Sequence, residues 1–484
     1  MDRETAEPHV ESLPGERARQ WVDHHQHHAA TSTFVYEFVW DFTAPAIGPF
    51  CTDIDGNVLM DFASHVASSP LGYNNPKIMD RLEEFGPIDP AKIAGQDFYA
   101  AGGGLPDDPD VPGPTQLQDR LIDITDHYGM DTVFLSNSGA EAIENAIKIC
   151  YDHVGGRHGI TFKGAFHGRT MGALSLNRSK AVHRRGFPEI ASVESVPYCE
   201  NASCDASSCT CGFLRPEAGE EAPDRRKRRT SRPDEEPSAV ITSALDAALN
   251  PKRGNLDPDD VSYVIMEPVQ GEGGYRFPSS AFMDEIESVL ERYDVPLIVD
   301  EIQTGLGRTG EMWGADHYSI EPDVITSAKA LRVGATISRE GVFPDETGRI
   351  SSTWGGGDLL AALQGVLTID AIQEHDLLSN ARKRGEQFKQ RIREEDPDFV
   401  EDVRGKGLML AIEFDSRPRR DAVVNAAFER GLLTLGCGFR TLRILPPLDV
   451  TAREIELGAD LLLDAFADSD VGDVEREFDA DEVI

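Results

Sequence analysis

The chain has 484 residues, 40% of them hydrophobic, so it can bury a large core in two domains or in one large and one small domain. Its 85 acidic and 47 basic residues give a formal net charge of −38 at pH 7, which repels nucleic acid and anionic membrane surfaces. Neither nucleic acid nor a membrane is therefore an expected partner.

The composition also indicates where the protein works. No run of about 18 or more apolar residues occurs, and the first residues lack the basic start and apolar middle of a signal peptide. We therefore expect a soluble, cytoplasmic protein. So large an acidic excess is best tolerated in concentrated salt, where the Debye length falls to about 3 Å at 1 M. The composition thus resembles that of halophilic proteins.

Changes in composition along the chain predict four parts. Residues 1–75 form an N-terminal segment, and residues 76–371 form a large domain. A polar loop of about residues 199–238 is inserted into the large domain and breaks its alternation of strands and helices. Residues 372–467 form a smaller α+β unit, and the acidic tail of residues 468–484 is predicted to be disordered.

The alternation begins with a strand over residues 132–135, which leads through a loop of small residues into a helix. Ser138 and Glu141 have the spacing of a capping box at the start of that helix. Free backbone N–H groups and the positive end of the helix dipole suit a phosphate bound by Ser138, Gly139 and Ala140. Any tight turn from a strand into a helix has a similar pattern, so the motif needs partners.

A short motif further along brings an aromatic ring, an imidazole and a guanidinium together. Phe166 can stack on a flat ring, although packing in the core is the commoner fate of phenylalanine. His167 can equally be a buried histidine whose hydrogen bonds are satisfied. Arg169 follows two positions later.

The inserted loop carries Cys199, Cys204, Cys209 and Cys211, four possible zinc ligands. Their spacing lacks the paired C-x-x-C steps of common zinc sites, so we predict no metal and keep zinc as the less favoured alternative. Seven cysteines are an odd number with uneven spacing, which argues against a disulfide framework.

Two further strands end on residues suited to catalysis. An apolar run at residues 296–299 ends on Asp300, and residues 322–328 precede Lys329. Parallel α/β sheets gather ligands at the carboxyl ends of their strands, so these side chains can converge. Pyridoxal phosphate needs an amine for its aldehyde and a carboxylate that keeps its ring nitrogen protonated. We assign the amine to Lys329 and the carboxylate to Asp300. The alternative is that Asp300 caps a loop and Lys329 is a solvated surface cation.

Two other strands end near charged residues. The strand at residues 261–266 leads into a glycine-rich loop with Glu267 and Glu272, which belongs either to the site or to an ordinary turn. In the C-terminal part, a short strand over residues 441–445 carries Arg443, which can clamp a carboxylate in two-pronged fashion or lie on the surface.

Taken together, these motifs resemble the class III pyridoxal-phosphate aminotransferases of fold type I, over about residues 34–467. The resemblance rests on the following segments: Ser138-Gly-Ala-Glu141, Phe166-His-Gly-Arg169, Glu267-Pro-Val-Gln-Gly-Glu272, Asp300-Glu-Ile-Gln-Thr-Gly305, Lys329 and Thr353. It implies an α/β fold with a mostly parallel, seven-stranded sheet between helices in the large domain. It also implies a small α+β domain built from the two chain ends.

The resemblance implies roles for individual residues. Lys329 would form the internal aldimine with pyridoxal 5'-phosphate, Asp300 would pair with the pyridinium nitrogen, and Gln303 would lie beside the ring hydroxyl. The other implied cofactor-binding residues are Ser138, Gly139, Ala140, Phe166, His167, Glu267 and Thr353. Thr353 would come from a neighbouring subunit, so the active unit would be a homodimer or a higher homo-oligomer.

Members that act on terminal amines carry two arginines that bind substrate, and Arg169, Arg443 and Glu272 match their positions. An ion pair between Glu272 and Arg443 would neutralise Arg443 when an amine-ended donor binds. Opening of this pair would expose the positive charge of Arg443 to the dicarboxylate 2-oxoglutarate. The short segment after Lys329, with residues 67–72 and 352–356, resembles lysine 6-aminotransferases. Residues 134–138 and the cysteine-bearing loop are more similar to archaeal 4-aminobutyrate aminotransferases.

The resulting prediction is transfer of the terminal amino group of 4-aminobutyrate, lysine or ornithine to 2-oxoglutarate, which gives a semialdehyde and glutamate. A racemase or decarboxylase on the same scaffold is the alternative, and it would release no glutamate. A nicotinamide site is disfavoured, because no Gly-x-Gly-x-x-Gly follows a strand and opens a helix.

Overall fold

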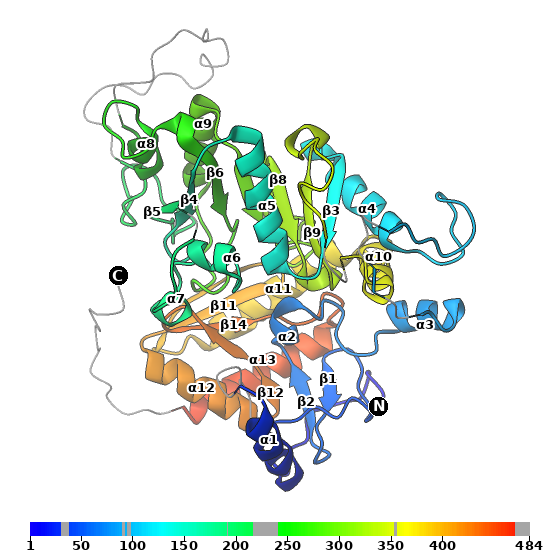
Figure 1. The fold of residues 1–484 in the computed structure, drawn as a ribbon. Coiled ribbons are helices and arrows are strands. Elements are labelled where there is room, and N and C mark those ends of the chain that lie inside the picture. The colour runs from blue at the N-terminus through cyan, green and yellow to red at the C-terminus, as the bar shows by residue number, and fades with distance from the viewer. Residues whose placement is uncertain are drawn as a thin grey trace.

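The computed structural model of the protein describes residues 1–30, 38–89, 92–93, 98–190, 192–215, 241–352 and 356–469. Figure 1 shows one large sheet flanked by helices and, below it, two smaller sheets with their own helices. The expected fold class, a mostly parallel seven-stranded α/β sheet with a small α+β part from both chain ends, is confirmed.

The large sheet has the strand order β3-β9-β8-β7-β6-β4-β5. Its strands are β3 (Thr132–Ser136), β4 (His158–Phe162), β5 (Ser192–Val196), β6 (Val261–Met266), β7 (Leu297–Asp300), β8 (Val324–Ser327) and β9 (Gly334–Ser338). Neighbouring strands run parallel except at β9, which pairs antiparallel with both β3 and β8. The carboxyl ends of β4, β6, β7 and β8 therefore lie along one edge.

The central strands are buried on both faces, which explains their continuous apolar sequences. Tyr263 and Ile265 of β6 pack in one core with helix α5 (Gly139–Val154). Val264 and Met266 point to the opposite face and pack with α9 (Ser280–Tyr293). Successive side chains of a strand thus serve two cores, one above and one below the sheet.

The smaller sheets combine distant parts of the chain. One has the order β1-β2-β12, and the other has the antiparallel order β10-β11-β14-β13. Their strands are β1 (Phe50–Thr52), β2 (Val58–Asp61), β10 (Val400–Lys406), β11 (Met409–Phe414), β12 (Leu432–Leu433), β13 (Leu435–Cys437) and β14 (Thr441–Ile444). Because β12 pairs with β2, the N-terminal segment becomes part of the C-terminal unit.

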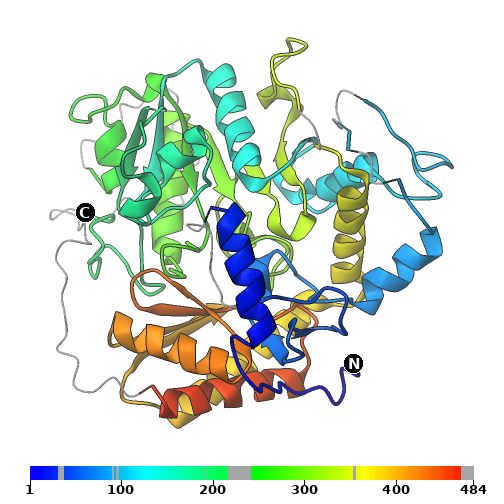
Figure 2. The same ribbon diagram turned by 60° about the horizontal axis from the view of Figure 1, so that its bottom comes forward.

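The helices of this unit are α11 (Leu377–Glu395), α12 (Arg417–Glu429) and α13 (Ala452–Ala467), and Figure 2 shows α12 and α13 side by side. The remaining helices are α1 (Glu16–His28), α2 (Ser64–Ala67), α3 (Pro76–Phe85), α4 (Pro114–Asp123), α6 (Met171–Leu176), α7 (Ala181–Arg184), α8 (Ala244–Leu249) and α10 (Leu359–Glu374). Within the described ranges, no helix is both long enough and apolar enough to cross a membrane.

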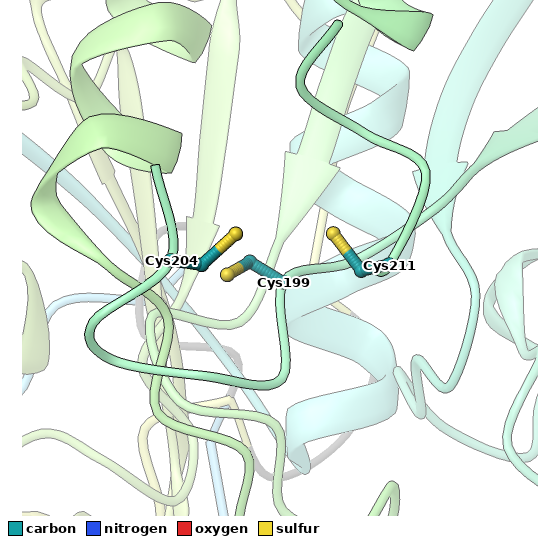
Figure 3. Close-up of side chains that lie close together, drawn as sticks. All are labelled: Cys199, Cys204 and Cys211. Atoms are coloured by element: carbon teal, nitrogen blue, oxygen red, sulfur yellow. The ribbon is translucent and has the colours of Figure 1, made fainter. Parts of the chain in front are cut away.

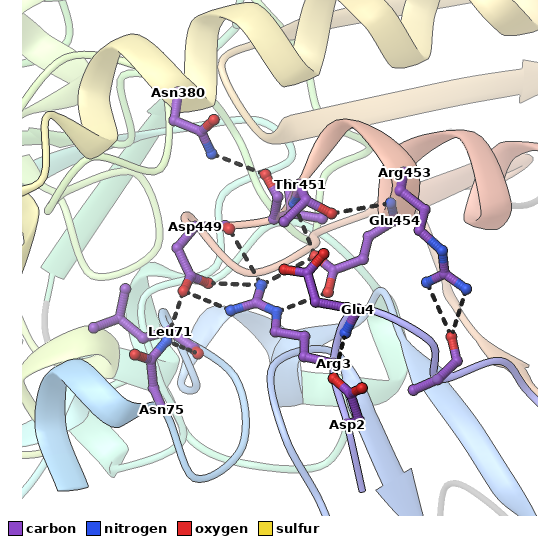
Figure 4. A network of polar contacts seen from close by, with 12 residues as sticks. Asp2, Arg3, Glu4, Leu71, Asn75, Asn380, Asp449, Thr451, Arg453 and Glu454 are labelled. Carbon is purple, nitrogen blue, oxygen red and sulfur yellow. Dashed lines mark hydrogen bonds and ion pairs between the residues drawn. The ribbon is translucent and has the colours of Figure 1, made fainter. Parts of the chain in front are cut away.

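A buried ion network ties the N-terminal residues to the start of α13 (Figure 4). Arg3 donates to Glu454 at 2.7 Å and to Asp449 at 2.8 Å, and the side chains of both acids are almost fully buried. Glu454 also closes a capping box with Thr451 at the start of α13. The chain therefore needs Arg3 to neutralise two carboxylates in its interior.

Candidate active site

A cavity of about 350 Å³ lies at the carboxyl ends of the parallel strands. It is lined by most of the residues that the sequence singled out: Ser138, Gly139, Ala140, Phe166, His167, Glu267, Glu272, Asp300, Gln303, Lys329 and Arg443. Arg169 is exposed and does not line the cavity, but its guanidinium lies 5.4 Å from the centre of the Phe166 ring. Thr353 lies outside the described residues.

Lys329 follows β8 and opens a short 3-10 turn, which directs its side chain into the cavity. Burial lowers the pKa of its ammonium group to about 8, and the nearby positive charge of Arg443 acts in the same direction. Asp300, Glu267 and Glu272 oppose this shift. The result is an amine that is partly uncharged near neutral pH and can act as a nucleophile or a base.

Asp300 ends β7 and is buried, with only 4% of its surface exposed. Its Oδ2 lies 2.7 Å from Nδ1 of His167, and its Oδ1 accepts from the backbone N–H of Ile302. Asn177 fixes the histidine loop, because its Oδ1 accepts from the His167 N–H at 2.7 Å. These bonds orient the carboxylate at the floor of the cavity.

Glu267 links two of the loops around the cavity. It accepts from the backbone N–H of Phe166 at 3.0 Å and from that of Gly271 at 2.8 Å. Burial raises the pKa of its carboxyl group to about 7, so part of the population is protonated at neutral pH. The glycine-rich loop after β6 therefore lines the cavity.

Helix α5 begins at the cavity with Ser138 as its N-cap, and the Ser138 hydroxyl accepts from the N–H of Glu141 at 3.3 Å. The predicted capping box forms only in part, because the Glu141 carboxylate accepts from Asn137 instead of from Ser138. A Cβ at Gly139 would come within 2.8 Å of the Ile302 side chain, so glycine lets the start of α5 pack closely against Ile302. The first N–H groups of α5 therefore face a space suited to an anion.

Glu272 lies between two cations. Its Oε2 is 3.3 Å from Arg443, and its Oε1 is 2.6 Å from Lys180. Burial alone would raise the pKa of the Glu272 carboxyl group, but the two cations outweigh burial and lower it. Glu272 is therefore a charged carboxylate that neutralises Arg443 at the edge of the cavity.

A family model, Aminotransferase class-III, matches residues 39–466. The chain belongs to the class III aminotransferases. This family is dependent on pyridoxal phosphate, which agrees with the cofactor expected from the sequence. The acetylornithine aminotransferase of Archaeoglobus fulgidus is 31% identical over 421 residues, which cover 86% of this chain and 93% of that protein.

Two further comparisons are informative. An alanine/serine racemase of Pyrococcus horikoshii is 28% identical and aligns with 96% of this chain and 93% of its own length. A lysine aminotransferase of M. tuberculosis, solved in its internal aldimine form, superposes with a TM-score of 0.75 at 24% identity. That comparison covers 93% of this chain and 99% of the other, and it establishes a common fold.

Several residues that line the cavity or contact its lining carry no clear signal in the sequence. Lys180 lies on a loop some distance along the chain from Glu272, and no motif pairs them. Val66 lines the cavity from a turn in which Ser64 to Ala67 all have positive φ. Residues other than glycine rarely adopt this conformation, and local propensities give no warning of it. Asn137 and Arg332 also line the cavity.

Proposed function

We propose that this protein transfers the terminal amino group of an ω-amino or diamino acid to 2-oxoglutarate. The related aminotransferases act on amine-ended compounds, and the donor class here comprises 4-aminobutyrate, lysine, ornithine and its acetylated form. The observation that carries the proposal is the Arg443–Glu272 pair at the edge of the cavity that contains Lys329. The same site can then bind an amine-ended donor while the ion pair is closed and the second carboxylate of 2-oxoglutarate when the pair opens.

The residues around the cavity fit pyridoxal phosphate. Among the residues that the structure describes, the buried atoms His167 Nε2 and Gln303 Oε1 have no hydrogen-bond partner, although both line the cavity. Gln303 Oε1 would accept from the ring hydroxyl, and Asp300 would hold a proton on the ring nitrogen. Phe166 would cover the ring, and Ser138 with the first N–H groups of α5 would hold the phosphate.

Bound pyridoxal phosphate supplies an aldehyde and a ring that withdraws electrons from the substrate carbon. Lys329 would hold the aldehyde carbon and, once released, move a proton between that carbon and the substrate carbon. Its lowered pKa suits both tasks. Arg443 would bind the second carboxylate of 2-oxoglutarate after Glu272 moves away, and Arg169 would bind the carboxylate common to both substrates.

We also propose that the active unit is a homodimer or a higher homo-oligomer. The support is the resemblance at Thr353, which would reach the phosphate of the neighbouring subunit's cofactor. Sedimentation analysis of the purified protein in concentrated salt would test this directly. A monomer with full activity would contradict the proposal.

The decisive experiment is a screen of amino donors against 2-oxoglutarate with glutamate formation as the readout. We expect at least one ω-amino or diamino acid to support repeated turnover, and Lys329→Ala to abolish turnover and the visible absorbance of the bound cofactor. Repeated turnover by Lys329→Ala would refute the role of Lys329. Screening with and without 2-oxoglutarate also separates transamination from reactions that need no acceptor.

Racemisation is the second candidate, and the racemase relative that aligns with 96% of this chain favours it. A racemase would invert the configuration of an amino acid without any acceptor and would form no glutamate. Chiral chromatography of alanine, serine and lysine after incubation with the enzyme alone would identify this activity. In that case the Glu272–Arg443 pair would have no second carboxylate to bind.

A further inference from the structure

The inserted loop brings its cysteines together on one side of the large sheet. The Sγ atoms of Cys199, Cys204 and Cys211 all lie within 4.8 Å of one another (Figure 3). Cys209 adds a fourth sulfur, 3.4 Å from that of Cys211. All four thiols are free, and the group lies outside the active-site cavity.

Tight turns produce this convergence, which the sequence spacing conceals. Asn201 accepts from the backbone N–H of Ser203 at 2.9 Å, and this turn carries the chain from Cys199 to Cys204. Asp205 accepts from the N–H groups of Ser207 and Ser208, and this second turn leads to Cys209. Asn and Asp side chains commonly stabilise such turns, so one preformed reversal separates Cys199 from Cys204 and a second separates Cys204 from Cys209.

The loop is held firmly at both ends. Tyr198 donates its hydroxyl to the carbonyls of Glu267 and Pro268 at 2.9 and 3.2 Å, directly behind the active-site strand β6. At the other end, Phe213 is fully buried against Phe282 of α9. The sulfurs therefore converge on a base that is fixed by the core of the large domain.

We propose that Cys199, Cys204, Cys209 and Cys211 bind one structural Zn²⁺ ion. Thiolates are preferred zinc ligands, and Zn–S bonds of about 2.3 Å in a tetrahedron place neighbouring sulfurs about 3.8 Å apart. The Sγ atoms of Cys199, Cys204 and Cys211 lie within 4.8 Å of one another, and that of Cys209 lies 3.4 Å from Cys211. Cys209 is not part of the three-sulfur group, so its side chain would have to rotate to become the fourth ligand. An iron–sulfur cluster spreads its thiolates over several irons and needs wider spacing.

Four protein ligands leave no open position on the metal, so the zinc is structural and takes no part in the reaction. The metal would fix the position of Tyr198, which follows β5 and precedes Cys199. Because the Tyr198 hydroxyl donates to the carbonyls of Glu267 and Pro268, the metal would also hold the loop that carries Glu272. An ion pair of 2.9 Å between Glu200 and Arg276 joins the same two loops. The metal thus braces one wall of the active site from outside.

The first test is the metal content of the holoenzyme, purified without chelators and passed through gel filtration after incubation with ZnCl₂. We expect about one zinc per chain by mass spectrometry, and less than about a tenth of that in the double variant Cys204→Ser/Cys211→Ser. Cys51→Ala serves as the control, because Cys51 is a buried thiol in β1, and it should retain the metal. Retained cofactor absorbance will show that each variant is folded.

A second measurement uses the unaltered chain and does not depend on the folding of a variant. Replacement of zinc by Co²⁺ should give the intense visible bands of a tetrahedral thiolate site. A metal-free holoenzyme after incubation with ZnCl₂, bound iron in place of zinc, or equal zinc in the double variant would each overturn the proposal. So would a native disulfide, seen as two fewer titratable thiols than the seven of the sequence.

Discussion

The charge of Glu272 should decide which substrates the site accepts, and Glu272→Gln removes that charge at nearly constant volume. Glu272 and Arg443 are 3.3 Å apart, and their side chains are only 19% and 8% exposed. At an effective dielectric constant of about 20, the gross attraction at this distance is about 5 kcal/mol. Desolvation offsets much of it, and a charged hydrogen bond contributes about 1.5–3 kcal/mol net.

An incoming dicarboxylate must displace Glu272 from Arg443. Removal of the Glu272 charge should therefore make the binding free energy of the dicarboxylate more favourable by that net amount. Since about 1.4 kcal/mol corresponds to a tenfold change, 2-oxoglutarate should bind roughly 10- to 150-fold more tightly to the variant. The half-reaction with an ω-amino donor should weaken, because an uncharged chain would then face the exposed Arg443. Stopped-flow measurement of the two half-reactions, each followed by cofactor absorbance, separates these effects.

Glu311→Gln is a matched control, because Glu311 forms a largely exposed ion pair with Arg382 at 3.1 Å. That variant should leave both half-reactions unchanged, since exposed ion pairs contribute little. Equal changes in the two half-reactions of Glu272→Gln, or weaker binding of 2-oxoglutarate, would refute the reasoning.

Three further results are expected. The rate at which apoenzyme captures pyridoxal phosphate should rise about tenfold per pH unit and level off near pH 8, because only the neutral Lys329 amine reacts. A capture rate that does not change with pH below pH 8 would contradict this. Asp300→Asn should release the cofactor roughly 10- to 150-fold faster, as judged by loss of visible absorbance after dilution, because a charged hydrogen bond is lost; unchanged retention would argue against its contact with the ring. Arg3→Ala should lower the free energy of unfolding by about 3–5 kcal/mol in denaturant titrations, since it leaves Asp449 buried without its main counter-ion. Arg391→Ala, which removes a partly exposed ion pair with Asp460, should cost less than about 1 kcal/mol by comparison.

The sequence was sufficient for the parts of the site that stand at strand ends. Asp300, Lys329 and Glu267 each follow an apolar run, and a parallel sheet delivers such ends to one edge whatever the order of its strands. The antiparallel placement of β9 was not predicted, because a short buried run shows no direction in its sequence.

Other features depend on three-dimensional contacts that leave no pattern in the sequence. The Lys180–Glu272 ion pair joins two loops whose proximity is set by the pairing of β4 with β6. The spacing of the cysteines gives no indication that their sulfurs converge, because the turns at Asn201 and Asp205 decide how close the sulfurs come. The cysteine spacings typical of zinc sites come from common loops. They do not apply to a loop in which Asn and Asp side chains fix the turns between the cysteines.

The charges around Lys329 also explain how one lysine would serve both half-reactions of the proposed transamination. Arg443 lowers the pKa of Lys329, and Glu272 raises it. If Glu272 left Arg443 without replacement, the lysine would become less basic just when it must take up a proton. The second carboxylate of 2-oxoglutarate would bring a negative charge to the same guanidinium, so the field at Lys329 would stay nearly constant. 2-Oxoglutarate, which would open the Glu272–Arg443 pair, would thus keep the basicity of Lys329 at the level that the closed pair maintains. An amine-ended donor would leave the pair closed, so no replacement for the charge of Glu272 would be needed.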